Sequence, residues 1–301
     1  MKTCVITGAT GGIGRYIALG MAQAGYRVIL VGRDAARGAA AKAWIAGQVR
    51  NAALGLLTAD LSSLAATAAL SRQIAAAAPA LDALILNAGI FLHRREETAE
   101  GHEKVLAVNH LSPFALIRAL EAPLRAAGGR IVTIGSSSSD RAGIDPRNLE
   151  LQRNWGMVRA YSQSKLAVMI ATFGWAARLR EAGITANVVH PGLVATSLVR
   201  TPGIIGLAWR LMAPFSRTAI QGAETPLYAA LSPDLAGVTG VYLKDKKTAR
   251  PNPLALQADL AARVWQATER LIEPTPPDPP RPTAPSQPVA APGDGQTKPV
   301  V

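Results

Sequence analysis

Short apolar runs alternate along the chain with longer segments that have the pattern of amphipathic or apolar helices. The short runs predict strands at residues 3–7, 27–31, 54–58, 83–87, 130–134, 185–190 and 239–243. The longer segments predict helices at residues 12–25, 35–50, 62–77, 102–127, 155–182, 218–231 and 254–273. Because apolar residues occupy consecutive strand positions, both faces of the sheet are expected to be covered. The alternation predicts the α/β class, with a doubly wound parallel sheet of about seven strands flanked by helices.

The composition changes after Glu273. Residues 274–301 hold roughly half of the 21 prolines and almost no large apolar side chains. Such a segment cannot bury enough apolar surface to offset the entropy of ordering it. We therefore expect one domain over residues 1–273 and a disordered or polyproline-like tail over 274–301. The tail either binds a domain that recognises proline-rich segments or has no partner, and we favour the second.

The net charge is +12 at pH 7. One explanation is a surface that binds nucleic acid or a membrane. The other is an arginine-rich composition that serves an anionic ligand and solubility. The arginines are scattered and no nucleic-acid-binding motif is present, so we favour the second and expect no nucleic-acid partner.

Cysteine and histidine usage excludes two classes of site. Cys4 is the single cysteine of the chain, so no disulfide framework is expected. The four histidines lack the spacing of metal ligands, and no metal is expected. No apolar segment with a cleavage site follows Met1, and no apolar run reaches the roughly 18 residues of a membrane span. We therefore expect a cytoplasmic protein.

A glycine motif follows the first predicted strand and opens the first predicted helix. Gly8, Gly12 and Gly14 form the pattern T-G-x-x-x-G-x-G. Gly8 allows a sharp turn from strand to helix, and Gly12 allows backbone to approach a pyrophosphate closely. The helix N-terminus then faces the phosphates with its partial positive charge. The alternative is a glycine turn without a ligand, but the strand before and the helix after favour a dinucleotide site.

The residue at the end of the second strand distinguishes two dinucleotides. An acidic residue there would bind the ribose hydroxyls of NAD, whereas the chain has Arg33, which suits a 2′-phosphate. Arg15 and Arg37 add positive charge nearby. We therefore predict NADP(H) rather than NAD(H). Asp34 either binds the ribose or caps the helix that follows.

The ordered motifs resemble the short-chain dehydrogenase/reductase superfamily, and most closely its retinol-dehydrogenase-like subgroup. They are "TGATGGIGRYIALGMAQAGYRVILVGRDAARG", "VNHLSPFALI", "AYSQSKLA", "VVHPGLVAT" and "TGVYLKDKKTARPNPLALQADLAARVWQATERL". The resemblance covers about residues 3 to 273 and implies a Rossmann-type oxidoreductase. Members of this family form dimers through helices that correspond to residues 102–127 and 155–182, although this sequence does not establish a homodimer.

The resemblance also assigns site residues. The cofactor-binding positions are Gly8, Thr10, Gly12, Ile13, Gly14, Arg33, Asp60, Leu61, Asn87, Ala88, Gly89, Tyr161, Lys165, Pro191, Gly192, Val194 and Thr196. Asp60 and Leu61 would contact the adenine, and Asn87 to Gly89 would support the central strand beneath the cofactor. Pro191, Gly192 and Thr196 would shape the nicotinamide site.

The catalytic positions implied by the resemblance are Asn109, Ser136, Tyr161 and Lys165. Ser136 lies 25 residues before Tyr161, as this subgroup requires, and Ser137 and Ser138 are the alternatives. Asn109 would hold a catalytic water. Ser112 and Pro113 follow it inside the same predicted helix, where proline should bend the helix or leave a carbonyl without a partner.

Reduction of a carbonyl needs a hydride on carbon and a proton on oxygen. Tyr161 and Lys165 share one helix face, and a free phenol has a pKa near 10. We expect Tyr161 to be the general acid and base, and Lys165 to lower its pKa and bind the nicotinamide ribose. Ser136 would orient the substrate oxygen, and Asn109 would join a water relay.

Residues 197–216 are rich in large apolar side chains. They predict either an apolar cover over a bulky hydrophobic carbonyl or alcohol, or a helix pair that packs on the core. The predicted function is an NADP(H)-dependent ketoreductase or alcohol dehydrogenase that acts on such a substrate. The alternative is a non-catalytic dinucleotide-binding regulator with the same fold.

Overall fold

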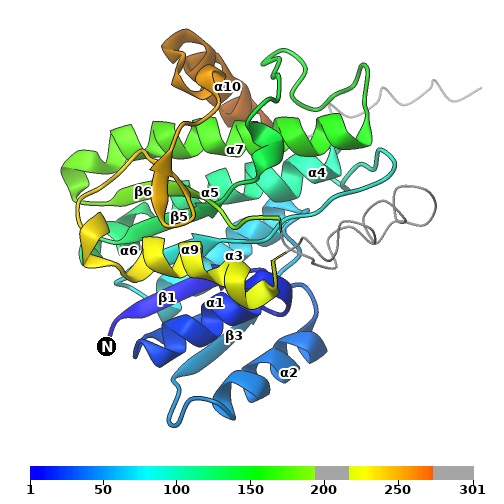
Figure 1. The fold of residues 1–301 in the computed structure, drawn as a ribbon. Coiled ribbons are helices and arrows are strands. Elements are labelled where there is room, and N and C mark those ends of the chain that lie inside the picture. The colour runs from blue at the N-terminus through cyan, green and yellow to red at the C-terminus, as the bar shows by residue number, and fades with distance from the viewer. Residues whose placement is uncertain (194–216, 274–301) are drawn as a thin grey trace, which may run out of the picture.

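The seven predicted strands lie parallel in one sheet of the computed structural model, which describes residues 1–193 and 217–273 (Figure 1). The strands are β1 Thr3–Thr7, β2 Arg27–Gly32, β3 Leu54–Thr58, β4 Ala83–Leu86, β5 Arg130–Ile134, β6 Thr185–His190, β7 Tyr242–Lys244 and β8 Lys247–Ala249. Their order is β3-β2-β1-β4-β5-β6-β7-β8. The doubly wound α/β sheet predicted from the sequence is therefore confirmed.

The helices agree with the predicted segments with one exception. They are α1 Gly12–Gln23, α2 Ala35–Ala46, α3 Leu64–Ala77, α4 Lys104–Leu106, α5 Ser112–Ala119, α6 Glu121–Ala127, α7 Met157–Leu179, α9 Ala219–Leu231 and α10 Ala258–Ile272. The exception is the segment 102–127, which was predicted as one helix. It consists of α4, a π-helical turn η1 at Ala107–Leu111, α5 and α6.

Each face of the sheet has its own apolar core. On one face α1, α2 and α9 cover the strands through side chains such as Ile17, Ile45 and Ala229 (Figure 1). On the other face α3, α5 and α7 cover them, with Leu70 and Leu116 in the core. All five residues of β1 are buried. This two-sided cover is why the strands consist of consecutive apolar residues.

The eighth strand was not predicted. β8 pairs antiparallel with β7 through a two-residue turn, in which Asp245 and Lys246 have φ angles of 52° and 61°. Positive φ at both central residues is the geometry that matches the twist of a β-hairpin. β8 is short and contains no apolar run that could indicate a strand.

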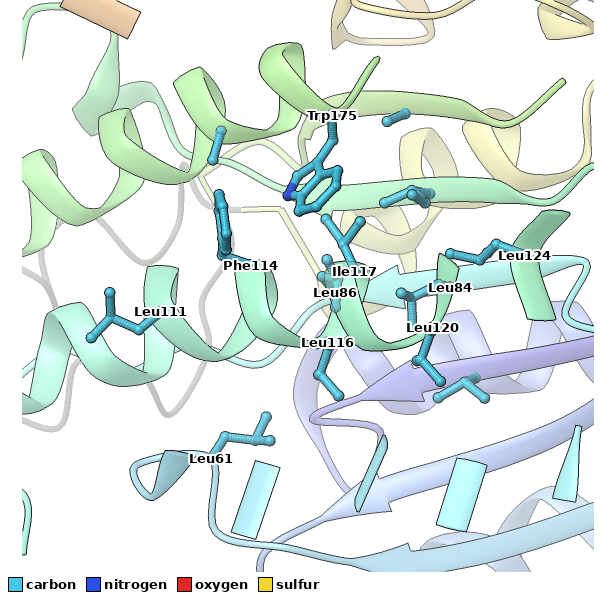
Figure 2. Close-up of a cluster of buried hydrophobic side chains, with 14 of the residues drawn as sticks. Leu61, Leu84, Leu86, Leu111, Phe114, Leu116, Ile117, Leu120, Leu124 and Trp175 are labelled. Atoms are coloured by element: carbon cyan, nitrogen blue, oxygen red, sulfur yellow. The ribbon is translucent and has the colours of Figure 1, made fainter. Parts of the chain in front are cut away.

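The last helix, α10, packs across α5 and α7. Trp265 of α10 lies 4.6 Å from the ring of Phe114 and 4.7 Å from the ring of Trp175, centroid to centroid. Figure 2 shows Phe114 and Trp175 together with Ile117 and the leucines of β4 in the same cluster. A Cβ on Gly174 would lie 2.9 Å from the Trp265 ring, so a glycine is needed for this close approach.

Two predicted segments lie outside the described residues. They are the apolar segment 197–216 and the proline-rich tail 274–301, and the predictions about them stay predictions. Within residues 1–193 and 217–273, no helix combines the length and the apolar character that a membrane span requires.

Replacing Trp265 by alanine is expected to lower the free energy of unfolding by about 3–5 kcal/mol, because the change empties a large site between three helices. Leu256→Ala is the control, since that side chain is 64% exposed, and it should change stability by less than about 0.5 kcal/mol. Urea unfolding measures both. A Trp265 variant as stable as the control would contradict the packing role of α10.

Candidate functional site

The predicted site residues gather at one edge of the sheet. The carboxyl ends of parallel strands meet there, and the strand order reverses between β1 and β4. In open α/β sheets this switch point is where ligands bind. The loops after β1, β2, β3, β4, β5 and β6 carry most of the predicted residues, and α7 lies behind them.

The glycine loop has the conformation that the sequence analysis requires. Gly8 and Gly12 have φ angles of 66° and 51°, which residues that carry a Cβ rarely adopt. A Cβ on Gly14 would lie 2.3 Å from the carbonyl oxygen of Gly8, so α1 starts in direct contact with the turn. Thr10 lies in the same loop and Ile13 in the first turn of α1, which contains no acidic residue. This helix N-terminus is therefore suited to a phosphate group.

Asn87 connects the glycine loop to β4. Its Nδ2 donates to the carbonyl oxygens of Thr7, at 2.9 Å, and of Gly8, at 3.1 Å. The backbone N–H groups of Asn87 and Ala88 both donate to the Thr7 hydroxyl, at 3.0 and 3.1 Å. Asn87 thus fixes the loops of the two central strands, in line with its predicted supporting role.

The three arginines near the glycine loop take different positions. Arg33 is exposed at the end of β2. A Cβ on Gly11 would lie 3.3 Å from an Arg37 guanidinium nitrogen, so Arg37 also lies at the loop. Arg15 stacks on Trp44 instead, with its Cζ 4.3 Å from the ring centroid. Asp34 caps α2 by accepting from the N–H of Arg37 at 3.0 Å, as one of the two alternatives for this residue predicts.

Asp60 and Leu61 follow β3 at the same edge. Burial alone would raise the pKa of the Asp60 carboxyl, but hydrogen bonds from Ser62 and the nearby Arg33 guanidinium lower it. The Leu61 carbonyl accepts from the Ser112 hydroxyl at 2.6 Å, which ties this loop to α5. Asp60 is therefore ionised at neutral pH, beside the arginine predicted to bind a 2′-phosphate.

Helix α7 brings Tyr161 and Lys165 to the site. All residues from 163 to 172 are buried, so the middle of the helix is enclosed by the sheet and its neighbouring helices. The Lys165 side chain points to the end of β5, where Nζ donates to the Ile134 carbonyl at 2.8 Å. Nζ lies 5.9 Å from the centroid of the Tyr161 ring.

Burial dominates the acid–base properties of this pair. It lowers the pKa of Lys165 to about 8. It raises the pKa of Tyr161, and a hydrogen bond with the Ser136 side chain opposes that rise only in part. The net shift is therefore opposite to the one expected, and a lowering of the Tyr161 pKa by Lys165 stays a prediction. The cause is desolvation, which disfavours the phenolate of Tyr161 and the ammonium of Lys165 alike.

Ser136 is the serine that the structure brings to Tyr161. Its hydroxyl also accepts from the N–H and the hydroxyl of Ser138, at 3.2 and 3.0 Å. Ser137 is exposed. Ser139 is buried and donates to the Ser136 carbonyl at 2.6 Å. Among the three candidate serines, the geometry favours Ser136.

Asn109 lies in the π-helical turn η1, behind Lys165. Its Oδ1 accepts from the N–H of Ile90 at 2.8 Å, and its Nδ2 donates to the Ile90 carbonyl and to Ser164 Oγ, both at 3.0 Å. Pro113 follows at the first turn of α5. The helix changes geometry where the proline cannot supply an N–H to the Asn109 carbonyl.

Gly89 separates Asn109 from Lys165. A Cβ there would lie 3.3 Å from Asn109 Oδ1 and 3.5 Å from Lys165 Nζ, so the two predicted catalytic side chains approach the same backbone position. The water relay between them stays a prediction.

The loop after β6 completes the edge. Pro191 is buried, and Gly192 has a φ angle of 89°. Val194 and Thr196, which the sequence analysis places in the cofactor site, lie outside the described ranges.

Sequence reasoning missed two neighbours of the site. The ring of Phe91 packs edge-on against Tyr161, with 5.2 Å between the centroids. Arg217, which follows residues 194–216 in the sequence, lies against Gly192. Neither has a local motif, because both contacts depend on the tertiary fold.

Replacing Lys165 by Met is expected to raise the free energy of unfolding near pH 7 by about 2 kcal/mol. On folding, the pKa of Lys165 falls from 10.5 to about 8. The folded chain therefore binds this proton more weakly than the unfolded chain, and each tenfold loss of proton affinity costs about 1.4 kcal/mol. Loss of the hydrogen bond to Ile134 reduces this gain in stability by about 1 kcal/mol. The advantage is full below the folded pKa and disappears as the pH rises towards the unfolded pKa.

Urea unfolding of both proteins at about pH 7 and about pH 9.5 measures this pH dependence. Lys42→Met is the control, because Lys42 is exposed on α2 and should show no such trend. A Lys165 variant less stable than the natural chain near pH 7 would show that the buried ammonium stabilises the fold.

Comparison with known proteins agrees with this geometry. The family model for short chain dehydrogenase matches residues 2–202. Retinol dehydrogenase 12 of Bos taurus is 35% identical over 272 residues, which cover 90% of this chain and 86% of the relative. Polyprenol dehydrogenase of Mus musculus is 34% identical over 283 residues, with 90% and 83% covered.

Solved structures show the same fold. A crystal structure of an uncharacterised protein from Mycobacterium Paratuberculosis superposes with a TM-score of 0.72 at 28% identity, and covers 91% of this chain and 94% of its own. A metagenomic short-chain oxidoreductase in complex with NADP gives a TM-score of 0.61 at 25% identity, with 80% and 95% covered. With the glycine loop and the α7 pair in their places, the chain belongs to the short-chain dehydrogenase family and is an oxidoreductase similar to the retinol dehydrogenases.

Proposed function

We propose that this protein is an NADP(H)-dependent reductase or dehydrogenase that interconverts a bulky apolar carbonyl compound and its alcohol. The observation that carries the proposal is the convergence of Ser136, Tyr161 and Lys165 at the switch point of the sheet, next to the glycine loop. A regulator that only binds a dinucleotide has no need of a half-buried phenol paired with a serine hydroxyl.

The proton chemistry follows from the environment of Tyr161. When bound, the nicotinamide cofactor supplies or accepts the hydride. Burial raises the pKa of Tyr161, so the phenol is protonated at neutral pH and can donate to the substrate oxygen. An alkoxide is a much stronger base than a phenolate, so even a weakly acidic phenol can protonate it. Ser136 is placed to orient the same oxygen.

Lys165 and Asn109 have supporting roles in this proposal. Lys165 reaches the carboxyl end of β5 and is placed to bind the nicotinamide ribose. With a pKa of about 8, its ammonium can give up and regain a proton near neutral pH, as a relay requires. The rigid contacts of Asn109 with Ile90 keep the far end of this route in a fixed position.

The preference for NADP(H) rests on charge at the end of β2. Arg33 is exposed there, and Arg37 approaches Gly11 of the glycine loop. Asp34 uses its Oδ1 to cap α2, a role that does not depend on a ribose hydroxyl. A 2′-phosphate would therefore meet two guanidinium groups.

The apolar substrate class is supported by the surroundings of Tyr161. Phe91 packs against its ring, Val158 precedes it by one helical turn and is 63% exposed, and Leu193 is 37% exposed. Retinol dehydrogenase and polyprenol dehydrogenase, the relatives named above, carry apolar alcohols in their names. A long apolar aldehyde is thus the substrate class to test first.

Replacing Tyr161 by Phe is expected to lower the rate of NADPH-dependent aldehyde reduction by about 10²–10⁴-fold, the usual contribution of a positioned acid. Tyr228→Phe is the control, because Tyr228 lies on α9 and its hydroxyl donates to Asp234, away from Tyr161. Alcohol oxidation by the natural chain needs the phenolate, so its rate should rise with pH towards the raised pKa of Tyr161.

Stopped-flow and steady-state absorbance of NADPH measure these rates. Undiminished reduction by the Tyr161 variant would exclude it as the acid. Tight NADPH binding without turnover in either protein would favour the regulator.

Replacing Arg33 by Ala is expected to raise the KM for NADPH about 10–100-fold and to leave the KM for NADH nearly unchanged, because a charged hydrogen bond to the 2′-phosphate is lost. Arg50→Ala removes the same charge between α2 and β3, at the opposite edge of the sheet, and should change neither constant. Equal effects on both cofactors would contradict a role for Arg33 in selecting NADP(H).

A further inference from the structure

Gly192 is covered by the side chain of Arg217. A Cβ on Gly192 would lie 2.5 Å from Arg217 Cδ, 2.9 Å from Nε and 3.2 Å from Cζ. The stem and the guanidinium of Arg217 therefore rest on the backbone of the turn after β6. With its φ of 89°, Gly192 needs glycine for two reasons, one conformational and one steric.

Arg217 is itself attached to a rigid helix. It directly precedes α9, whose first turn is closed by a reciprocal cap between Thr218 and Gln221. Its backbone N–H donates to the Leu193 carbonyl at 2.7 Å, so the chain that leaves the turn and the chain that returns are joined. The side chain thus approaches Gly192 from a fixed point.

The guanidinium is held from the other side by the β7–β8 hairpin. Arg217 Nη1 lies 2.7 Å from Asp245 Oδ1, at the first position of the two-residue turn. Lys244, the residue before it, pairs with His190, which immediately precedes the Pro191–Gly192 turn. The turn after β6 is therefore enclosed by three anchored groups: the end of β7, Asp245 and Arg217.

The charges of this pair are half-exposed, with 38% and 51% of the two side chains accessible. Ion pairs of this kind contribute little to the stability of a fold. Its geometric effect is more specific, because it fixes the one guanidinium that lies on Gly192.

We propose that Arg217, held by Asp245, is a positioning residue that sets the place of the Pro191–Gly192 turn at the nicotinamide site. This rests on the proposed function, in which that turn borders the nicotinamide. A displaced turn would allow the reacting groups to separate, and misplacement by about 1 Å can cost about 10²-fold in rate. Cofactor binding through the glycine loop and Arg33 would be much less affected.

The test compares four variants of the full chain. Arg217→Ala should lower kcat for aldehyde reduction about tenfold or more, with a smaller change in the KM for NADPH. Arg217→Lys, which keeps a stem over Gly192 and a charge for Asp245, should recover most of the loss. Asp245→Asn should cause an intermediate loss. Glu224→Gln is the matched control, because it breaks the 2.7 Å pair between Lys246 of the same hairpin and Glu224 of α9 without touching Gly192.

Hydrogen exchange of the segment 186–193, followed by mass spectrometry, gives a readout that does not depend on turnover. Exchange there should be faster in Arg217→Ala and Asp245→Asn than in Glu224→Gln. If Arg217→Ala does not fold, the comparison of the surface variant Asp245→Asn with Glu224→Gln tests the positioning role.

The outcomes separate this proposal from the proposed function. Equal kinetics and equal exchange in Arg217→Ala, Asp245→Asn and the control would overturn the positioning role. A natural chain that turns over no carbonyl with either cofactor would overturn the proposed function, while the exchange comparison would still decide whether Arg217 holds the turn.

Discussion

The buried ammonium of Lys165 is the constraint on which the site depends. A charged group in a protein interior is costly unless it is compensated, and among residues 1–193 and 217–273 this one donates to one carbonyl, that of Ile134. The compensation is incomplete, as the fall of its pKa to about 8 indicates. The group stays in place because α7 is enclosed over residues 163–172, and the apolar packing of that helix offsets the desolvation. The burial of Lys165 thus lowers the stability of the fold and at the same time positions a group that can transfer a proton.

The surrounding helices support this arrangement. The π-helical turn η1 sets Asn109 behind Gly89 and Lys165, and α10 closes the outer side of α5 and α7 with Trp265. This packing bears on the homodimer implied by the family resemblance. A dimer through α5 and α7 would have to form beside α10, which already covers part of their surface.

Much of the fold could be predicted because the sheet is covered on both faces. Each central strand is a short apolar run, and the glycine loop and the Y-x-x-x-K pair are local patterns that the fold brings to one edge. The breaks in the helical segment 102–127 were harder to predict from the sequence. Pro113 indicates an irregularity, but its form depends on the contacts of Asn109 with Ile90. β8 is short and has no apolar run, and its strand character comes from pairing with β7.

The electrostatics of the site were the least predictable feature. Spacing places Tyr161 and Lys165 on one face, but it contains no information on solvation. Burial decides the pKa values of both groups, and it reverses the direction expected for Tyr161. The contact of Arg217 with Gly192 joins residues separated by an entire segment of the chain, so it too needed the tertiary structure.

The most direct test of the account is to follow the hydride itself. NADPH carrying deuterium on the reactive face of nicotinamide C4 would be incubated with the full chain and long-chain apolar aldehydes, retinaldehyde and a polyprenal among them, and the alcohols analysed by mass spectrometry. The account predicts one deuterium on the former carbonyl carbon of at least one apolar product. Tight binding of NADPH without deuterium in any product, across a panel that also includes polar carbonyls, would contradict it. Deuterium only in polar products would retain the hydride transfer and overturn the apolar substrate class.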